Sequence, residues 1–281
     1  MNRQTSIQEN SLKQAVMELV RKSGKRLTPL DLERIIVRDF GLTGRAARKL
    51  IKSLISENSL AYTQQLGRTF AELSTNRPFH AGEGVILAPP DISFTPEPGQ
   101  ILIRIAPGAS FGTGDHSTTR IALQLISRIF RTQTLPCPPE NAKVLDIGTG
   151  TGVLAIAACL MGAAQAVGID TDNCAQTEAA QNVRLNNLED YIQIKEDIKA
   201  TASDDRTSSF PLILANLRYP TLAGMQSFIS ELASPGGVLV FSGFRDDEAK
   251  DLAQTYISSG FRQTDALTEN NWAGLVFKKS P

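Results

Sequence analysis

One glycine-rich segment constrains the fold of this chain more than any other feature. Residues 143–170, KVLDIGTGTGVLAIAACLMGAAQAVGID, have the pattern of a buried strand, a loop, a helix and a second strand. The loop carries Gly148, Gly150 and Gly152, whose missing side chains allow a tight turn and the close approach of a ligand. A helix that starts at such a loop directs its first N–H groups at the ligand. The segment therefore predicts an α/β domain with a nucleotide-type binding site.

Acidic residues near this loop help to separate two classes of ligand. A nicotinamide site needs G-x-G-x-x-G after a strand, but position 153 is Val and the third glycine comes one residue early. Asp146 precedes the loop and suits a cationic ligand better than a pyrophosphate, and Asp170 ends the second strand, where an acid can bind ribose hydroxyls. The pattern favours S-adenosylmethionine, a sulfonium without phosphate, over a purely structural glycine turn. The predicted contacts to this methyl donor are Asp146, Gly148, Thr149, Gly150, Gly152 and Asp170.

The remaining C-terminal residues predict a doubly wound, Rossmann-like sheet of seven strands. After the core segment, strands are expected at 191–197, 210–216, 236–243, 261–267 and 272–279, with helices at 171–187, 221–233 and 246–259. Ligands of open α/β sheets bind at the carboxyl ends of strands. Asp197 and Asn216 stand at two such ends, beside Asp146 and Asp170. Asp197 is expected to reach the adenine amino group, with Glu196 and simple solvent exposure as the alternatives.

The charge of the chain is unevenly distributed, although Lys+Arg and Asp+Glu both total 29. Residues 1–76 carry 13 basic and 7 acidic residues, which leaves 16 basic and 22 acidic residues for 77–281. Such a difference indicates two units with different partners. We expect an N-terminal domain over 1–76 and a catalytic domain over 142–281. Between them, over 77–141, we expect a Pro-rich connector with a strand at 101–107 and a loop-to-helix segment at 108–130.

The N-terminal unit has the pattern of a small helical domain. Apolar residues recur at helical spacing over 11–22, 28–39 and 43–57, with Thr28 and Thr43 as candidate N-caps. Residues 60–73 contain two short runs around Gly67, which is typical of a hairpin. Three helices followed by a hairpin predict a winged-helix domain that binds a substrate or partner.

The third predicted helix carries a basic stripe. Its members are Arg45, Arg48, Lys49 and Lys52. One interpretation is a recognition helix that contacts nucleic acid phosphates. A solvated helix face explains the same pattern, since such faces are usually charged. Winged helices also serve as protein-docking modules, and no base-reading pattern decides between these roles.

Composition excludes several other classes of protein. No run of 18 apolar residues predicts a membrane span, and the polar N-terminus does not have the pattern of a secretory signal. The three cysteines are too few and too scattered for a disulfide framework or a zinc site. We therefore expect a reducing, cytoplasmic setting and no metal.

Residues 77–280 resemble the methyltransferases that modify the eleventh protein of the large ribosomal subunit. The motifs that carry the resemblance are RPFHAGEGVILAPP, IAPGASFGTGDHSTT, VLDIGTGTGVLAIAACLMGAAQAVGIDTD, LILANL and WAGLVFKK. The resemblance implies a class I S-adenosylmethionine-dependent methyltransferase whose product is S-adenosylhomocysteine. By position, Thr119, Gly148, Asp170 and Asn216 would contact the donor. Phe111, Thr113 and His116 would line its methionine end or the acceptor channel.

The N-terminal unit departs from this family, which carries a small α/β domain there that grips the ribosomal protein. Substrate choice lies in the appended domain rather than in the transferase fold. The first hypothesis is a protein N-methyltransferase that acts on lysine or α-amino groups, with a ribosomal protein as one possible acceptor. The alternative is a nucleic-acid-binding winged-helix protein whose methyltransferase domain modifies RNA or DNA, or only senses the donor.

Three residues are candidates for catalysis. Asn216 and Tyr219 could orient an amine through their side-chain oxygens, although Asn-Leu-Arg-Tyr differs from the Asn-Pro-Pro-Tyr of amide and adenine N-methyltransferases. His116 is one of two histidines and is interpreted as a donor-site or gating contact. A loop histidine bonded to backbone is the alternative for His116.

Overall fold

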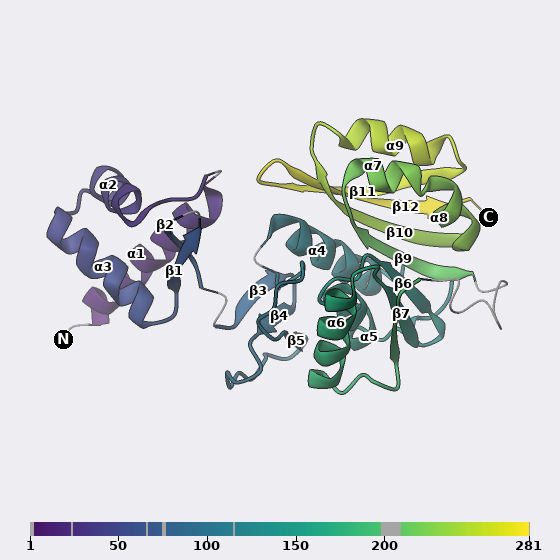
Figure 1. The fold of residues 1–281 in the computed structure, drawn as a ribbon, viewed down its shortest axis with the longest axis horizontal. Coiled ribbons are helices and arrows are strands. Elements are labelled where there is room, and N and C mark those ends of the chain that lie inside the picture. Colours follow the sequence, from purple (N-terminus) through teal and green to yellow (C-terminus); the bar gives the residue numbers. More distant parts are fainter. Residues whose placement is uncertain are drawn as a thin grey trace. The chain divides into compact units, whose positions relative to one another are not determined.

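The chain forms two compact units, Met1–Arg77 and Pro78–Pro281. The computed structural model describes residues 3–23, 25–65, 67–74, 77–114, 116–197 and 209–280 (Figure 1). The glycine-rich segment and every strand predicted after residue 142 lie in the second unit.

The first unit contains three helices and a hairpin. These elements are α1 (Arg3–Lys22), α2 (Pro29–Phe40), α3 (Gly44–Ser56), β1 (Leu60–Gln65) and β2 (Arg68–Leu73). The strands β1 and β2 pair antiparallel, and Leu27 makes an additional bridge to Ala71. The order of elements agrees with the sequence pattern, except that α1 begins well before residue 11. Assignment to the winged-helix class stays a prediction.

Local capping residues set where two of these helices begin. Thr28 caps α2 and forms a capping box with Asp31, in which the Thr28 Oγ1 accepts from the Asp31 N–H at 3.2 Å. Thr43 caps α3 by accepting from the Ala46 N–H at 3.3 Å. Each cap satisfies a backbone N–H that has no partner within the helix. Because this depends on a local residue type, the start of both helices could be predicted from the sequence.

The second unit is built on a seven-stranded sheet, as predicted. Its strands are β6 (Lys143–Ile147), β7 (Gln165–Ile169), β8 (Ile192–Lys195), β9 (Phe210–Asn216), β10 (Ala233–Arg245), β11 (Phe261–Glu269) and β12 (Trp272–Lys279). The order across the sheet is β11-β12-β10-β9-β6-β7-β8. Only β12 runs antiparallel to its neighbours. The order reverses between β6 and β9, so the carboxyl ends of these strands form the crevice where α/β sheets bind ligands.

Helices cover both faces of this sheet (Figure 1). One layer holds α4 (Ser117–Arg131), α5 (Val153–Leu160) and α6 (Asn173–Leu185), and the other holds α7 (Tyr219–Gly224), α8 (Gln226–Leu232) and α9 (Ala249–Ile257). Side chains alternate along β9, so that Leu212 and Leu214 join the core under α4 and α5. Ile213 and Ala215 join the core under α7 and α9. Burial on both faces explains the continuous apolar run of this strand.

Residues 78–141, which we expected to be largely a connector, lie in the second unit and form regular elements. They contain β3 (Phe79–Gly82), β4 (Val85–Ala88) and β5 (Ile101–Arg104), followed by α4 and a short 3-10 turn at Pro139–Asn141. These strands form a separate sheet in which β4 is fully buried. We predicted the third strand at 101–107 but missed the first two, because each has four residues and prolines follow β4 directly. The single helix predicted over 221–233 was also wrong, since α7 ends and α8 begins at Met225.

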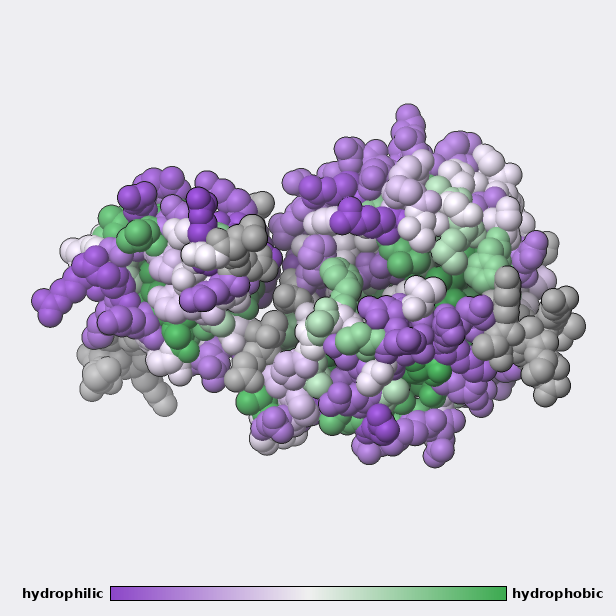
Figure 2. All heavy atoms as spheres, in the orientation of Figure 1, coloured by the Kyte–Doolittle hydropathy of each residue, from purple (hydrophilic) through white to green (hydrophobic). Residues whose placement is uncertain are grey.

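In the face shown in Figure 2, polar residues dominate and apolar residues gather in small groups. None of the helices in the described ranges is long and apolar enough to cross a bilayer. The same ranges contain no group of His, Cys, Asp and Glu side chains that could hold a metal ion.

Candidate functional site

The glycine loop joins β6 to α5 through backbone that favours glycine. Gly148, Gly150 and Gly152 have φ angles of 68°, 55° and 81°, all in the left-handed region. The loop is tied to the next strand because Gly148 and Thr149 donate their N–H groups to the Ile169 carbonyl at 2.8 and 3.0 Å. Gly152 then begins α5, so the first turn of this helix faces the carboxyl edge of the sheet.

A second segment, residues 108–116, packs directly on the glycine loop. The N–H of Thr151 donates to the Phe111 carbonyl at 3.0 Å, and the Thr151 hydroxyl donates to the Gly112 carbonyl at 2.9 Å. A Cβ on Gly150 would lie 2.3 Å from the Phe111 carbonyl oxygen. The absent side chain at Gly150 therefore makes room for this second segment, a close contact that the sequence pattern assigned to a ligand.

Asp146 lies beneath the loop with its side chain buried. Its Oδ2 accepts from the Thr149 hydroxyl at 2.7 Å and from the Ala155 N–H at 3.2 Å. Desolvation raises the pKa of Asp146 to about 6, against the bond from Thr149, which lowers it. The carboxylate thus links β6, the loop and α5. Its Oδ1 is buried and has no hydrogen-bond partner among the described residues.

Asp170 follows β7 and holds the outer side of the glycine loop. Its Oδ2 accepts from the Gly150 N–H at 2.9 Å, and its Oδ1 accepts from the Asp172 N–H at 3.1 Å. The amide of Gln176 donates to the Asp170 carbonyl at 2.8 Å and fixes the backbone there. The carboxylate is therefore placed beside the glycine loop at a strand end, the position of a ribose-binding acid.

Asn216 ends β9 and presents an oxygen without a partner. Its Nδ2 donates to the Thr119 hydroxyl of α4 at 3.5 Å, whereas its Oδ1 is buried and unpaired in the described part of the chain. Gly243 makes space for this side chain, because a Cβ there would lie 2.8 Å from Oδ1. Ser242, paired with Asn216 in the sheet, also has a buried hydroxyl without a described partner.

Three unpaired oxygens thus share one face of the sheet. Alternation along the strands turns Asp146, Asn216 and Ser242 toward α4 and α5, at the carboxyl ends of β6, β9 and β10. Buried polar atoms are nearly always paired, so unpaired ones that gather in one place need an explanation such as a bound ligand. We missed Ser242 and Gly243 in the sequence, where no motif marks them.

An aromatic group stands beside this edge. The His116 ring lies 5.2 Å from the Phe111 ring and 5.0 Å from the Trp272 ring, both in edge-to-face geometry. The Arg245 guanidinium lies 4.6 Å from the Trp272 ring centroid. The Phe111 side chain is 52% exposed, so it is available to cover a ligand. The sequence offered no sign that Trp272 would join this group.

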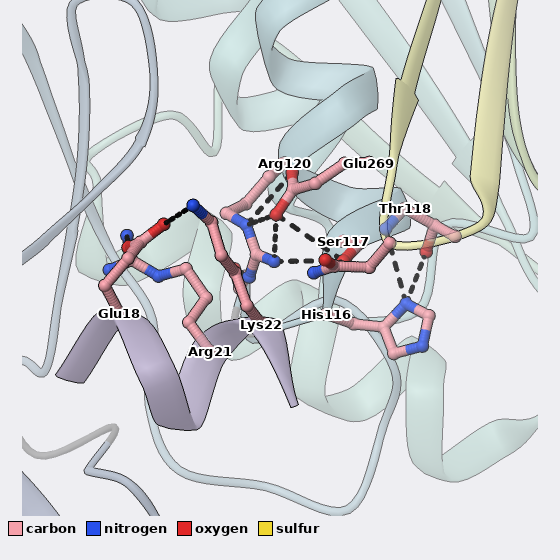
Figure 3. Close-up of polar contacts among 10 residues, drawn as sticks. Glu18, Arg21, Lys22, His116, Ser117, Thr118, Arg120 and Glu269 are labelled. Carbon is pink, nitrogen blue, oxygen red and sulfur yellow. Dashed lines mark hydrogen bonds and ion pairs between the residues drawn. The ribbon is translucent and has the colours of Figure 1, made fainter. Parts of the chain in front are cut away.

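His116 is the N-cap residue of α4. Its Nδ1 accepts from the Thr118 N–H at 3.3 Å and lies 2.9 Å from the Thr118 hydroxyl (Figure 3). Because Nδ1 accepts a hydrogen bond from a backbone N–H, it carries no hydrogen of its own, and Nε2 carries the ring hydrogen in this arrangement. The bond to backbone, the alternative raised from sequence, is present, and contact of His116 with the donor stays a prediction.

A partly buried ion pair stabilises the same helix start, and the sequence did not reveal it. Arg120 donates through Nε to Glu269 at 3.0 Å and through Nη2 to the Ser117 hydroxyl at 3.0 Å (Figure 3). Asn270 donates to the same hydroxyl at 3.1 Å. Because Glu269 ends β11 and Asn270 follows it, this network fixes the start of α4 to the β11–β12 edge of the sheet.

The structure separates two predicted site residues from this group. Asp197 follows β8 and is exposed. Tyr219 begins α7, and its ring packs against the core on the opposite face of the sheet from Asn216. Thr113 lies in the 108–116 segment, while Asp115 of the same segment lies outside the described residues.

Comparison with known proteins identifies the family. The family model described as ribosomal protein L11 methyltransferase (PrmA) matches residues 70–280. The chain belongs to the PrmA family. PrmA relatives include a ribosomal protein L11 methyltransferase of Syntrophotalea carbinolica, 32% identical over 198 residues, which cover 70% of this chain and 62% of the relative. A relative of the same name from Geobacter sulfurreducens is 32% identical over 201 residues, with 72% and 62% covered. The chain therefore spans less than two thirds of these relatives.

A solved PrmA-family structure shares the fold. It is described as ribosomal protein L11 methylase from Lactobacillus delbrueckii subsp. bulgaricus, with a TM-score of 0.62 and 24% identity. The match covers 73% of this chain and 100% of that chain. This similarity confirms the class I methyltransferase fold for the second unit of a PrmA-family chain.

Proposed function

We propose that this chain is an S-adenosylmethionine-dependent protein N-methyltransferase whose acceptor is a ribosomal protein. The observation that carries the proposal is the unpaired Oδ1 of Asn216, buried at the same strand edge as Asp170 and the glycine loop. The relatives' printed name, ribosomal protein L11 methyltransferase, supports the acceptor. Lysine ε-amino and α-amino groups are both within the proposal.

The residues at the edge fit the methyl donor. Asp170 would accept the ribose hydroxyl hydrogens beside the glycine loop, whose own N–H groups are bonded within the protein. The unpaired Oδ1 atoms of Asp146 and Asn216 suit a cationic ligand. Among the described contacts, no Arg or Lys neutralises the Asp146 carboxylate. Phe111 and Thr113 would line the methionine end, and Asp197 the adenine. When bound, the donor supplies a methyl group already activated by a positive sulfur.

Transfer requires a neutral amine placed in line with that methyl group. A lysine amine has an ordinary pKa of about 10.4, and desolvation in a closed site favours its neutral form. Asn216 Oδ1 would accept one N–H and aim the nitrogen lone pair. In that arrangement the amine would take the methyl group as the donor leaves as a neutral thioether, and the methylated nitrogen would release its extra proton to solvent. Exclusion of water and alignment of the amine by Asn216 would supply the catalysis, and His116 is a further candidate for alignment.

The test uses purified protein, donor with a labelled methyl group, and purified ribosomal protein L11. We expect label in the protein, and we expect Asp170→Ala to abolish donor binding measured by calorimetry. The matched control is Asp190→Asn, which changes an exposed acid of the same unit. If an extract instead yields label only in its nucleic-acid fraction, the protein acceptor is wrong. If Asp170→Ala binds donor as well as the unchanged protein does, the assignment of the donor site is wrong.

The first unit is proposed to select the partner, with α3 as the contacting helix. Arg45, Arg48, Lys49 and Lys52 are all exposed, and the opposite side of α3 is buried. Arg48 is paired with Glu33 at 2.7 Å on the surface. This one-sided distribution supports contact with the phosphates of the RNA that accompanies a ribosomal acceptor. A reducing, cytoplasmic setting is part of the proposal, since Cys137, Cys159 and Cys174 are all free.

A further inference from the structure

One side of α6 carries three polar residues at four-residue intervals. Glu178, Asn182 and Asn186 therefore lie above one another on the helix. All three bind the backbone of residues 104–110, which follow β5 and lead into the 108–116 segment. We call these three residues the α6 ladder. The backbone that they hold leads directly into Phe111 and Gly112, which contact the glycine loop.

The two asparagines bind backbone in the manner of a neighbouring strand. Asn186 accepts from the Arg104 N–H at 2.8 Å and donates to the Arg104 carbonyl at 2.8 Å. Asn182 is almost wholly buried, accepts from the Ala106 N–H at 2.9 Å and donates to the Thr151 carbonyl at 2.8 Å. One amide therefore joins the incoming segment to the glycine loop. This pairing also explains why β5 ends at Arg104 instead of at residue 107.

Glu178 holds the part of the segment nearest to Phe111. Its two carboxylate oxygens accept from the N–H groups of Ala109 and Ser110 at 2.9 and 3.0 Å. A Cβ on Gly108 would lie 2.2 Å from Glu178 Oε2, so a larger residue at 108 would displace the carboxylate from this position. Desolvation opposes the charge, but the bonds from Ala109 and Ser110 lower the pKa of Glu178, which keeps the carboxylate ionised. Charged acceptors form the stronger class of hydrogen bond.

We propose that the α6 ladder positions the 108–116 segment, and that Glu178, through its bonds to the backbone, determines where Phe111 and His116 lie relative to the donor site. The inference rests on the proposed function for the identity of the donor. The hydrogen bonds of the ladder are present without the donor, because each of them joins two residues of the second unit. Glu178 and Asn182 are thus positioning residues for the 108–116 segment. They act through the backbone and touch no reacting atom.

The chain contains its own spectroscopic probe of this segment. Trp272 is the single tryptophan, and its ring lies 5.0 Å from His116. Movement of the segment away from the glycine loop changes that contact and the polarity around the indole. Emission from Trp272 therefore reports the position of the segment with no ligand present. A purely structural role of Glu178 elsewhere on α6 would leave it unchanged.

The test compares Glu178→Gln with Glu189→Gln, an exposed control beyond the same helix. An amide at 178 keeps one acceptor and turns an N–H donor toward the Ser110 N–H. We expect altered Trp272 emission and about tenfold weaker binding of S-adenosylhomocysteine, the scale of one charged hydrogen bond. Gly108→Ala, which pushes on Glu178 from the other side, is expected to give the same two changes. Both variants are compared at temperatures where circular dichroism shows them folded.

The outcomes separate this inference from the proposed function. Emission and affinity equal to those of the control in both variants would overturn the positioning role. Altered emission with unchanged affinity would also overturn it, because the segment would then move without consequence for the donor. If the unchanged protein fails to bind the donor product, the proposed function fails. Altered emission in Glu178→Gln would then still establish that the ladder positions the segment.

Discussion

Asp146 is a carboxylate that the fold buries with no basic partner described. Burial raises its pKa from the ordinary 3.8 to about 6, although its bonds to Thr149 and Ala155 act in the opposite direction. The unfolded chain therefore loses the Asp146 proton at lower pH than the folded chain. The ionised form destabilises the fold, and this penalty develops as pH rises from about 4 to about 6.

Asp146→Asn is expected to remove this pH dependence. Relative to the unchanged protein, the variant should gain about 3 kcal/mol in free energy of unfolding between pH 3.5 and pH 7, from a difference of about 2 pKa units. Urea titrations followed by Trp272 emission measure this for the second unit. Asp190→Asn, at an exposed position, should show no comparable trend. A constant difference between Asp146→Asn and the unchanged protein across this range would contradict the buried-charge explanation.

Single residues differed in how far sequence could place them. Asp170 and Asn216 were placed at strand ends because each comes at the end of a run of apolar residues that marks a strand. The partner of Arg120 is Glu269, 149 residues away, and no local pattern links the two. Gly150 was recognised as a site of close approach, but its neighbour is the Phe111 carbonyl. Contacts of that kind depend on the packing of distant segments.

Elements were predictable where burial is extensive and caps are local. β9 is buried on both faces and its bounds, Phe210–Asn216, are those predicted from the apolar run. The four-residue strands β3 and β4 were missed, because four residues are too few to show a clear alternation of apolar and polar side chains. These strands are stabilised mainly by pairing with neighbouring strands. The α6 ladder could not be foreseen either, since asparagine on a helix usually indicates a solvated position.

Thr28→Ala tests the capping box of α2. Loss of the Thr28 hydroxyl leaves the Asp31 N–H without its acceptor and should lower the stability of α2 by about 1 kcal/mol. Hydrogen exchange of the α2 amides should become about fivefold faster, provided these amides exchange by local opening. Thr177→Ala, on α6 of the other unit, is the matched control and should leave α2 unchanged. Equal protection of α2 in both variants would show that the box is dispensable.

At the scale of the whole molecule, the neutral chain consists of two oppositely charged parts. Residues 1–76 carry 13 Lys and Arg against 7 Asp and Glu. The surface ion pairs of the first unit, such as Arg48–Glu33 and Arg21–Glu18, contribute little to stability. Charge that adds little to folding remains available for association. The long-range attraction of such a surface falls steeply with salt, which makes the proposed RNA contact measurable.

Replacing Arg45, Lys49 and Lys52 by Ala should weaken binding of the full chain to ribosomal RNA. Each lost phosphate contact removes about 0.7–0.9 from the slope of log K against log salt, so the slope should fall by about 2 to 3. The control replaces Arg184, Lys250 and Arg262, three exposed basic residues of the second unit, and makes the same change in net charge. Calorimetric affinity for S-adenosylhomocysteine should be equal in both triple variants. If the two variants lose RNA affinity and slope equally, net charge rather than α3 governs the binding.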